Sequence, residues 1–348
     1  MGVPSYAPLD AALDILSGYG PQLANGNFNH APMVAEALCA LGRPDAVIPW
    51  TLRYRERLVV RDPAGEPIRP AEWRTALGQR ERFAAWSALF AEELCDAPWQ
   101  DVVNRWVGRL APGISAAATH GAIRVGHAVR ALTVGESPQR LRELADAFAS
   151  WAKSYSELPA TGGLVNGVMS PREALARVPI VPTERRRPGS ITTALAALGD
   201  EFAPAIGLAD LEGDIDELIA QLTELFARVY LANVKDTLTA VVFIHGVTSL
   251  TALGHVVPYL TDATARRLLR YGWQAGCGLY ACYGSGAGVA VEIAPGEGDA
   301  DSLIEAALAN GDEHVIKFTE ACLYRDALGP SPAYSAAIAS VVGMIGRR

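Results

Sequence analysis

Lysines, paired cysteines and clustered positive charge are all scarce in this 348-residue chain. Only three of its 30 basic residues are lysines, namely Lys153, Lys235 and Lys317. The net charge is −8 and no stripe of Lys and Arg is present to neutralise phosphates, so we expect no nucleic-acid partner. The five cysteines are odd in number and form no CxxC pair, which favours reduced thiols and a cytoplasmic protein.

The signature motifs of several common enzyme classes are also missing. No HExxH sequence and no CxxC pair is present, so a zinc hydrolase has no support. Ser285 lies between Tyr283 and Ala287 where a GxSxG nucleophile elbow has glycines, which leaves a serine hydrolase unsupported. The glycine-rich residues 276–288 follow a segment of helical character. A dinucleotide-binding fold needs a strand before such glycines, so we do not expect one.

Nothing along the chain marks a domain boundary or a targeting segment. No linker rich in Pro, Gly or Ser separates two halves, which predicts a single domain over residues 1–348. The first residues lack a basic segment followed by an apolar core, so no signal peptide is expected. Residues 237–261 are a membrane-length run without Asp, Glu, Lys or Arg, but they contain Thr, Ser, Gly and His. We therefore predict a central helix buried on all sides rather than a membrane span.

Helical periodicity dominates the sequence, and strand alternation is almost absent. Leu141, Leu144, Phe148 and Trp151, for example, mark one face of a helix that begins with a capping serine and a proline at residues 137–138. Helices are predicted over residues 9–17, 33–41, 80–94, 99–110, 114–132, 137–151, 214–229, 236–253, 262–275, 301–309, 313–326 and 331–345. Residues 58–68 predict a short hairpin. The expected fold is all-α, a single large multi-helix domain around a buried central helix.

Lys317 is the most unusual residue of the predicted helix 313–326. It stands among Val315, Ile316 and Phe318, and three residues after His314, so the lysine and the histidine share one helix face. A buried lysine is costly unless it is paired, deprotonated or modified. We therefore expect chemistry at this pair.

Four of the six histidines, His30, His120, His245 and His314, lie at or near the start of separate apolar helices or within them. A single such histidine is more simply a core residue bonded to a backbone carbonyl. Four of them on separate helices favour a metal site, because helical bundles build such sites from side chains that project inward. Imidazole ligands suit iron, zinc or copper.

The remaining polar residues of these helices are expected to have other roles. His127 lies about 10 Å along the helix from His120, so it is expected beyond the ligands or facing a substrate, and His255 is expected to be structural. Asp312, Glu313 and Glu320 offer a carboxylate. Asp312 and Glu313 are more simply partners of the helix dipole at an exposed helix start.

Several short motifs together resemble the questin oxidase-like family, over about residues 19–328. The motifs are Asn29-His30 before an apolar helix, Ala-Leu-Gly at 40–42, His120-Gly121, His245 followed by Gly-Val-Thr, and Asp-Glu-His-Val-Ile-Lys at 312–317. Members of this family are oxygenases of aromatic polyketides, including enzymes that open an anthraquinone ring, and they show no flavin motif. Pro32 and Met33 stand where fungal members carry further histidines, and this chain is shorter, which bears on the substrate more than on the metal.

For a ring-opening member, the resemblance implies a non-haem iron, Fe(II), held by four histidines and a carboxylated lysine. The corresponding residues here are His30, His120, His245 and His314, with Lys317 as the carbamate. The chemistry is reasonable because carbon dioxide adds to a neutral amine, which burial favours.

The resemblance leads to a functional expectation: an iron-dependent oxidoreductase that uses O2 on a polycyclic aromatic polyketide in secondary metabolite biosynthesis. Ring cleavage or a Baeyer-Villiger-type oxygen insertion would follow, in the second case with NADPH as a reductant. His127, Trp273 and Tyr280 are the candidates for contact with the substrate. The alternatives are a metal-free, NADPH-dependent Baeyer-Villiger oxidase and a non-catalytic protein that binds an aromatic polyketide.

Overall fold

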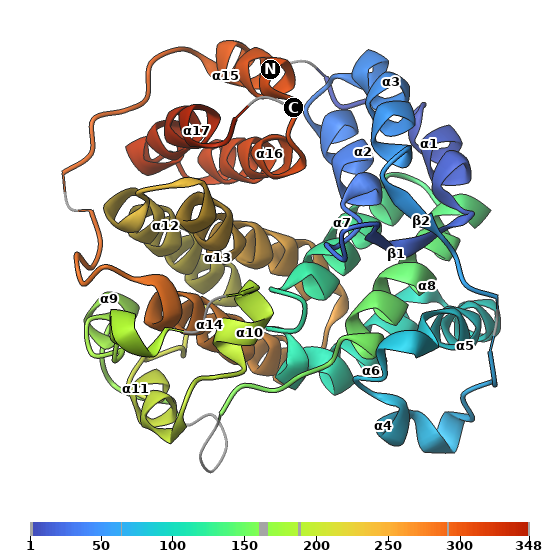
Figure 1. Cartoon of the computed structure of the whole chain (residues 1–348), viewed down its shortest axis with the longest axis horizontal. Helices are drawn as coiled ribbons and strands as arrows, with labels where there is room; N and C mark the ends of the chain where they lie inside the picture. Colours follow the sequence, from blue (N-terminus) through green and yellow to red (C-terminus); the bar gives the residue numbers. More distant parts are fainter. Residues whose placement is uncertain (1–2, 64, 160–165, 187–188, 291, 347–348) are drawn as a thin grey trace.

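The computed structural model describes residues 3–63, 65–159, 166–186, 189–290 and 292–346, and these form 17 α-helices, six short 3-10 helices and one two-stranded sheet (Figure 1). The predicted all-α fold is therefore confirmed. The first helices are α1 (Leu9–Leu16), α2 (Ala31–Ala40), α3 (Pro44–Arg55), α4 (Trp73–Ala76), α5 (Phe83–Asp96), α6 (Trp99–Leu110), α7 (His120–Val134), α8 (Pro138–Lys153) and α9 (Pro171–Leu175). They are followed by α10 (Ile191–Leu195), α11 (Ala203–Ile206), α12 (Ile215–Asn233), α13 (Thr237–Val256), α14 (Asp262–Tyr283), α15 (Ala300–Asn310), α16 (Glu313–Leu328) and α17 (Pro332–Met344). The 3-10 helices are η1 (Pro70–Glu72), η2 (Arg80–Arg82), η3 (Ala111–Gly113), η4 (Thr183–Arg185), η5 (Asp200–Phe202) and η6 (Val257–Tyr259).

Side-chain caps explain where the long helices begin. The side chain of Ser137 accepts a hydrogen bond from a backbone N–H in the first turn of α8, with a proline at the first helical position. Asp214, Thr261 and Asp312 cap α12, α14 and α16 in the same way. Asp236 caps α13 through a capping box. Each cap satisfies backbone donors that the helix itself leaves without a partner.

Helix α13 is the central helix. It packs against α7, α12, α14 and α16, and Figure 1 shows it in the middle of the molecule between α14 and α16. The span Thr237–Tyr259 is long and apolar enough to cross a membrane, with a mean hydropathy of 1.7, but 78% of its most apolar window is buried inside the protein. Its apolar sequence is thus accounted for by burial against neighbouring helices, and the predicted buried central helix is confirmed.

Two glycines allow α7 to lie close to its neighbours. A Cβ atom on Gly121 would stand 2.6 Å from the Cβ atom of Trp151 on α8. A Cβ atom on Gly126 would stand 2.6 Å from both the Cβ atom and the carbonyl oxygen of Ala252 on α13. Both distances are far below van der Waals contact, so only glycine permits this packing. The close approaches hold α7 against α8 near its N-terminal end and against the central helix near its middle.

Two local predictions need correction, and one further helix was not predicted. Helix α7 begins at His120 rather than at residue 114, because Ala117, Ala118 and Thr119 have positive φ angles of 49°, 54° and 66°. The described residues of the range 58–68 form no hairpin of their own; instead β2 (Leu58–Val60) pairs antiparallel with β1 (Tyr19–Leu23). Two prolines follow β2 at positions 63 and 67 and lack the N–H groups that a returning strand would need. Helix α3 has weak apolar periodicity and an internal proline, and the sequence pattern did not predict it.

Candidate metal centre

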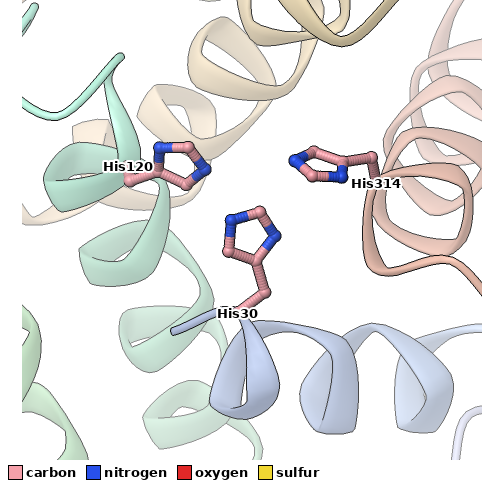
Figure 2. A group of neighbouring side chains, drawn as sticks. All are labelled: His30, His120 and His314. Atoms are coloured by element: carbon pink, nitrogen blue, oxygen red, sulfur yellow. The ribbon is translucent and has the colours of Figure 1, made fainter. Parts of the chain in front are cut away.

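Three of the four candidate histidines converge from the starts of three helices. Figure 2 shows His30, His120 and His314 pointing toward one another. His30 is the residue directly before α2, His120 is the first residue of α7, and His314 is the second residue of α16. One ring nitrogen atom from each of the three histidines lies within 4.8 Å of the other two. The structure thus brings together residues that are up to 284 positions apart, as the sequence predicted.

His245 of the central helix completes this group. Its Nε2 atom lies 3.3 Å from Nε2 of His120. The ring centroids are separated by 4.5 Å between His314 and His30, 4.5 Å between His30 and His120, 4.7 Å between His120 and His245, and 6.1 Å between His245 and His314. The four imidazoles are therefore neighbours in a closed ring, which we call the imidazole cluster.

The hydrogen bonds of His120 and His245 fix which nitrogen carries the proton. Nδ1–H of His120 donates to the carbonyl of Ala117, and Nδ1–H of His245 donates to the carbonyl of Val241, both at 2.5 Å. A carbonyl oxygen only accepts, so both Nδ1 atoms are protonated. Burial lowers the pKa of His245 to about 3 and holds the pKa of His120 well below its usual value, so both rings are neutral. Their Nε2 lone pairs consequently face each other at 3.3 Å, an arrangement that a bound cation would relieve.

His314 and His30 also have ring nitrogen atoms that could bind a metal ion. Nδ1 of His314 lies 3.1 Å from Oδ1 of Asp312, a carboxylate-histidine pair of the kind that orients metal ligands. The same Asp312 oxygen accepts the backbone N–H of His314 at 2.8 Å, so one carboxylate both caps α16 and holds the ring. Nδ1 of His30 is buried and has no hydrogen-bond partner among the described residues. A buried nitrogen without a partner is rare unless a ligand binds it.

The segment before His30 is held by the side chain of Asn29. Its amide nitrogen donates to the carbonyl of Gly20 at 3.0 Å, and its oxygen accepts the N–H of Ala31 at 2.9 Å. The backbone N–H of His30 donates to the hydroxyl of Tyr54 on α3. Phe28 stacks on the ring of His120 with centroids 4.8 Å apart. The Asn-His pair of the sequence therefore has a direct structural role in placing the first imidazole.

Lys317 is buried one turn after His314 on α16. Burial lowers its pKa to about 8. Its charge in turn contributes to the lowered pKa values of His30, His120 and His245, which places the amine close to the imidazole cluster. No hydrogen bond or ion pair of Lys317 is found in the described part of the chain. The lysine thus has the surroundings that the sequence predicted.

Asp312 and Glu313 are not at an exposed helix start, as the sequence suggested, but are buried. Glu313 lies in the wall of the cavity described below and is paired with Arg57 at 3.3 Å. The side chains of Asp312, Glu313 and His314 bring potential ligand atoms within 4.8 Å of one another. Glu313 thus places a carboxylate next to the imidazole cluster. Its position beside His314 in the sequence is what indicated this residue as a candidate. Glu320 is instead paired with Arg130.

A cavity of about 590 Å³ reaches all four histidines of the imidazole cluster. Its walls also include Phe28, residues 115–118 before α7, the end of α8, helix α10 and the first turns of α13. Ligand sites for small organic molecules commonly have volumes of roughly 300–1,000 Å³. The cavity is thus large enough for a molecule of several fused rings beside the cluster.

The cavity wall includes part of a strained backbone segment. Ala117, Ala118 and Thr119 are three consecutive non-glycine residues in the left-handed region, which costs roughly 1–2 kcal/mol for each residue. The segment also supplies the Ala117 carbonyl that accepts the hydrogen bond of His120. Such strain persists where surrounding contacts hold it, and it is concentrated at functional sites.

The three residues predicted to contact substrate lie elsewhere. Nδ1 of His127 is 2.6 Å from Glu36, on the part of α7 beyond His120. The indole N–H of Trp273 donates to the carbonyl of Ile206, and Tyr280 lies on the same helix, α14. None of the three is among the residues that line the cavity. Helical spacing identified them as buried, but it did not indicate which buried face borders the cavity.

No protein-family model and no curated protein sequence matches this chain. Functional interpretation of the centre therefore rests on its geometry and on the short motifs in the sequence.

Proposed function

We propose that this protein is a non-haem iron oxygenase that acts on a polycyclic aromatic polyketide of the anthraquinone type. The observation that carries the proposal is the pair of Nε2 lone pairs of His120 and His245 at 3.3 Å, with nitrogen atoms of His30 and His314 beside them. Four neighbouring imidazoles on four separate helices, of which burial keeps His30, His120 and His245 neutral, have the chemistry of a transition-metal site. His30, His120, His245 and His314 would hold the ion.

Iron is favoured over zinc or copper by the resemblance to the questin oxidase-like family and by the proposed use of dioxygen. When bound, the metal supplies the redox chemistry that activates O2. Protein groups supply the rest. The Ala117 and Val241 carbonyls and the Asp312 carboxylate hold three of the rings by their Nδ1 atoms, which keeps each Nε2 free for the ion.

We propose in addition that Lys317 is carboxylated when the metal is bound. An ammonium group beside a metal cation is repelled by it, whereas a carbamate is an anion with an oxygen ligand. Carbon dioxide adds only to the neutral amine, and a pKa lowered to about 8 by burial raises the neutral fraction near physiological pH. The Glu313 carboxylate is the second anionic oxygen group available beside the imidazoles.

The aromatic substrate would occupy the cavity that borders the imidazole cluster. Phe28, Leu158, Ile191 and Leu195 give its wall apolar surfaces on which flat rings pack. Phe28 also stacks on His120 and so connects this apolar wall to the cluster. The substrate is expected to lie with one ring toward the imidazoles and to exclude water from them.

The two proposed reactions differ in what they consume. Ring cleavage that places both atoms of O2 in the product needs no external reductant. A Baeyer-Villiger-type insertion keeps one oxygen atom and reduces the other to water, with NADPH supplying the two electrons.

The five cysteines are free thiols, which supports action in the cytoplasm.

Metal analysis of protein purified without chelator tests the proposal. We expect close to one iron per chain, with both iron and oxygen consumption lost in His245→Ala. His255→Gln is the matched control, because His255 lies on the same helix but is not part of the cluster, and it should retain iron. Activity of a metal-stripped sample with NADPH would instead favour the metal-free oxidase. Tight binding of an anthraquinone hydroquinone without oxygen consumption would favour a non-catalytic binding protein.

Carboxylation is tested separately by nuclear magnetic resonance with isotopically labelled bicarbonate. A carbamate signal is expected in the wild type and in Lys235→Ala, whose lysine is exposed, and not in Lys317→Ala. A signal that survives Lys317→Ala would assign the carbamate to another amine.

A further inference from the structure

Lys153 is a second buried lysine, and it lines the same cavity as the imidazole cluster. It is the last residue of α8, and only 3% of the residue is exposed. Within the described ranges, no hydrogen bond or ion pair involves Lys153. A cationic side chain that is buried without a partner is costly, so its position in a cavity wall calls for an explanation.

The charges around Lys153 increase this cost. Burial, and then the positive charge of Arg80, lower the pKa of Lys153 to about 8, while Asp62 acts in the opposite direction from beyond ion-pair distance. Because pH 7 lies below that pKa, most Lys153 side chains still carry a proton there. Arg80 also lines the cavity, is exposed, and belongs to no ion pair in the part of the chain that the structure describes. This part of the wall is therefore cationic.

A structural role at the end of a helix does not explain Lys153. A cation in the last turn of a helix is stabilised by the helix dipole, but an exposed lysine would gain this equally well. Lys153 instead lines the cavity, as do Ser154 and Ser156, which follow it in the chain. Neither α8 nor η2 carries a histidine of the imidazole cluster. The cavity thus has a cationic wall that is separate from the cluster.

We propose that the ligand of this cavity is an anion, and that Lys153, assisted by Arg80, pairs with its carboxylate or phenolate oxygen while its aromatic rings lie toward the imidazole cluster. This inference rests on the proposed function and narrows it, because the substrate becomes an acidic polycyclic aromatic rather than a neutral one. A charged hydrogen bond in a largely buried setting is strong, since little water competes with it. The same contact would fix which ring faces the cluster.

Binding of a matched pair of probes tests this inference. Anthraquinone-2-carboxylate and anthraquinone-2-carboxamide share their rings and differ in charge, and their dissociation constants are measured by calorimetry on the full-length protein. We expect the wild type to bind the carboxylate about tenfold or more tightly than the amide. Lys153→Met should abolish this preference without changing amide binding, whereas Lys153→Arg should keep it. Lys235→Met is the control for loss of an exposed lysine, and Lys153→Gln replaces Lys153→Met if the latter fails to fold.

The other outcomes overturn the inference in distinguishable ways. Equal binding of the two probes by the wild type would remove the anion site and leave the aromatic cavity intact. A preference that survives Lys153→Met but disappears in His245→Ala would place the anion at the imidazole cluster. Failure of both probes to bind would remove the proposed aromatic substrate and, with it, this inference.

Discussion

Two polar clusters, each mostly buried, lie mainly on the same four helices, and only one of them is complete. Helices α7, α13 and α16, and α2 with the residue before it, each contribute one histidine to the imidazole cluster and at least one residue further along to a second group. We call this second group the charged cluster; its members are Tyr6, Glu36, His127, Arg130, His255 and Glu320.

The charged cluster satisfies its groups with one another. Arg130 donates to both carboxylate oxygens of Glu36, at 2.7 and 2.5 Å, and also to Glu320. Tyr6 donates to Glu36 at 2.5 Å, and Nε2 of His255 lies 3.2 Å from Arg130. Burial alone would raise the pKa of Glu36, but the charge of Arg130 and the hydrogen bond with His127 outweigh it and hold the pKa well below its usual value.

The imidazole cluster differs because nitrogen atoms at its centre have no hydrogen-bond donor to pair with among the described residues. The lone pairs of His120 and His245 oppose each other, and Nδ1 of His30 has no partner among the described residues. A polar cluster that is complete holds its helices together, whereas one that is incomplete requires a ligand. The charged cluster is therefore expected to determine stability, and the imidazole cluster metal binding.

The largest effect on stability is expected from Glu36→Gln. This change leaves Arg130 buried with only one carboxylate partner, so the free energy of unfolding should fall by about 3–5 kcal/mol. Urea unfolding measures it. The matched control is Glu305→Gln, because Glu305 forms an exposed pair with Arg43 and should matter little. Equal effects of the two changes would show that the charged cluster does not hold the helices.

Bound metal should raise the free energy of unfolding of the wild type by nearly as much as Glu36→Gln lowers it. Iron at 100 to 1,000 times its dissociation constant adds about 2.7–4.1 kcal/mol to the free energy of unfolding. His314→Gln should abolish this gain while changing the stability of the metal-free protein much less than Glu36→Gln does. Melting temperatures with and without iron test the point. A gain that persists in His314→Gln would place the metal elsewhere.

Acid should destabilise the two clusters in different pH ranges. Burial holds the pKa values of His30, His120 and His245 below the usual value of 6.5, so the unfolded chain binds more protons than the folded one below that pH. As the pH falls below 6.5, each of these three histidines removes about 1.4 kcal/mol per pH unit from the stability of the metal-free protein.

The contribution of Glu36 has the same sign, because its folded carboxylate also stays deprotonated at a pH where the unfolded chain takes up a proton. Its folded pKa is lowered from 4.5, so its stabilisation is complete above that value and is lost only as the pH falls further. Urea midpoints should therefore fall between pH 7 and 5 through His30, His120 and His245, and His255 of the charged cluster should add a contribution of the same sign. A flat profile over this range would contradict neutral imidazoles in the folded protein.

The smallest effect on stability is expected from a substitution in the strained segment before α7. Ala118→Gly removes the steric cost of a positive φ angle of 54° at a non-glycine residue, although glycine also has more freedom in the unfolded chain. The net change should be a gain of up to about 1 kcal/mol, measured by urea unfolding. Ala122→Gly, at a helical position of α7, is the control and should be destabilising. A loss of stability in Ala118→Gly would show that the segment is not strained.

Much of the fold and of the candidate centre could be predicted from the sequence. Apolar periodicity and caps are local properties, and they gave most of the long helices and the buried central helix. His30, His120, His245, His314 and Lys317 could be selected because polar residues on apolar helices are unusual in any arrangement. The sequence predicted that these side chains would meet, but it did not predict where in the fold they would do so.

Only the tertiary structure decided which groups meet. The partners in the charged cluster, such as Arg130 with Glu36 and with Glu320, are 94 and 190 residues apart, and no local pattern connects them. The same holds for the pairing of β2 with β1 and for the place of Lys153 in the cavity wall. Periodicity determines which face of a helix is buried, but the packing of helices determines whether that face meets a core, a charge or a cavity.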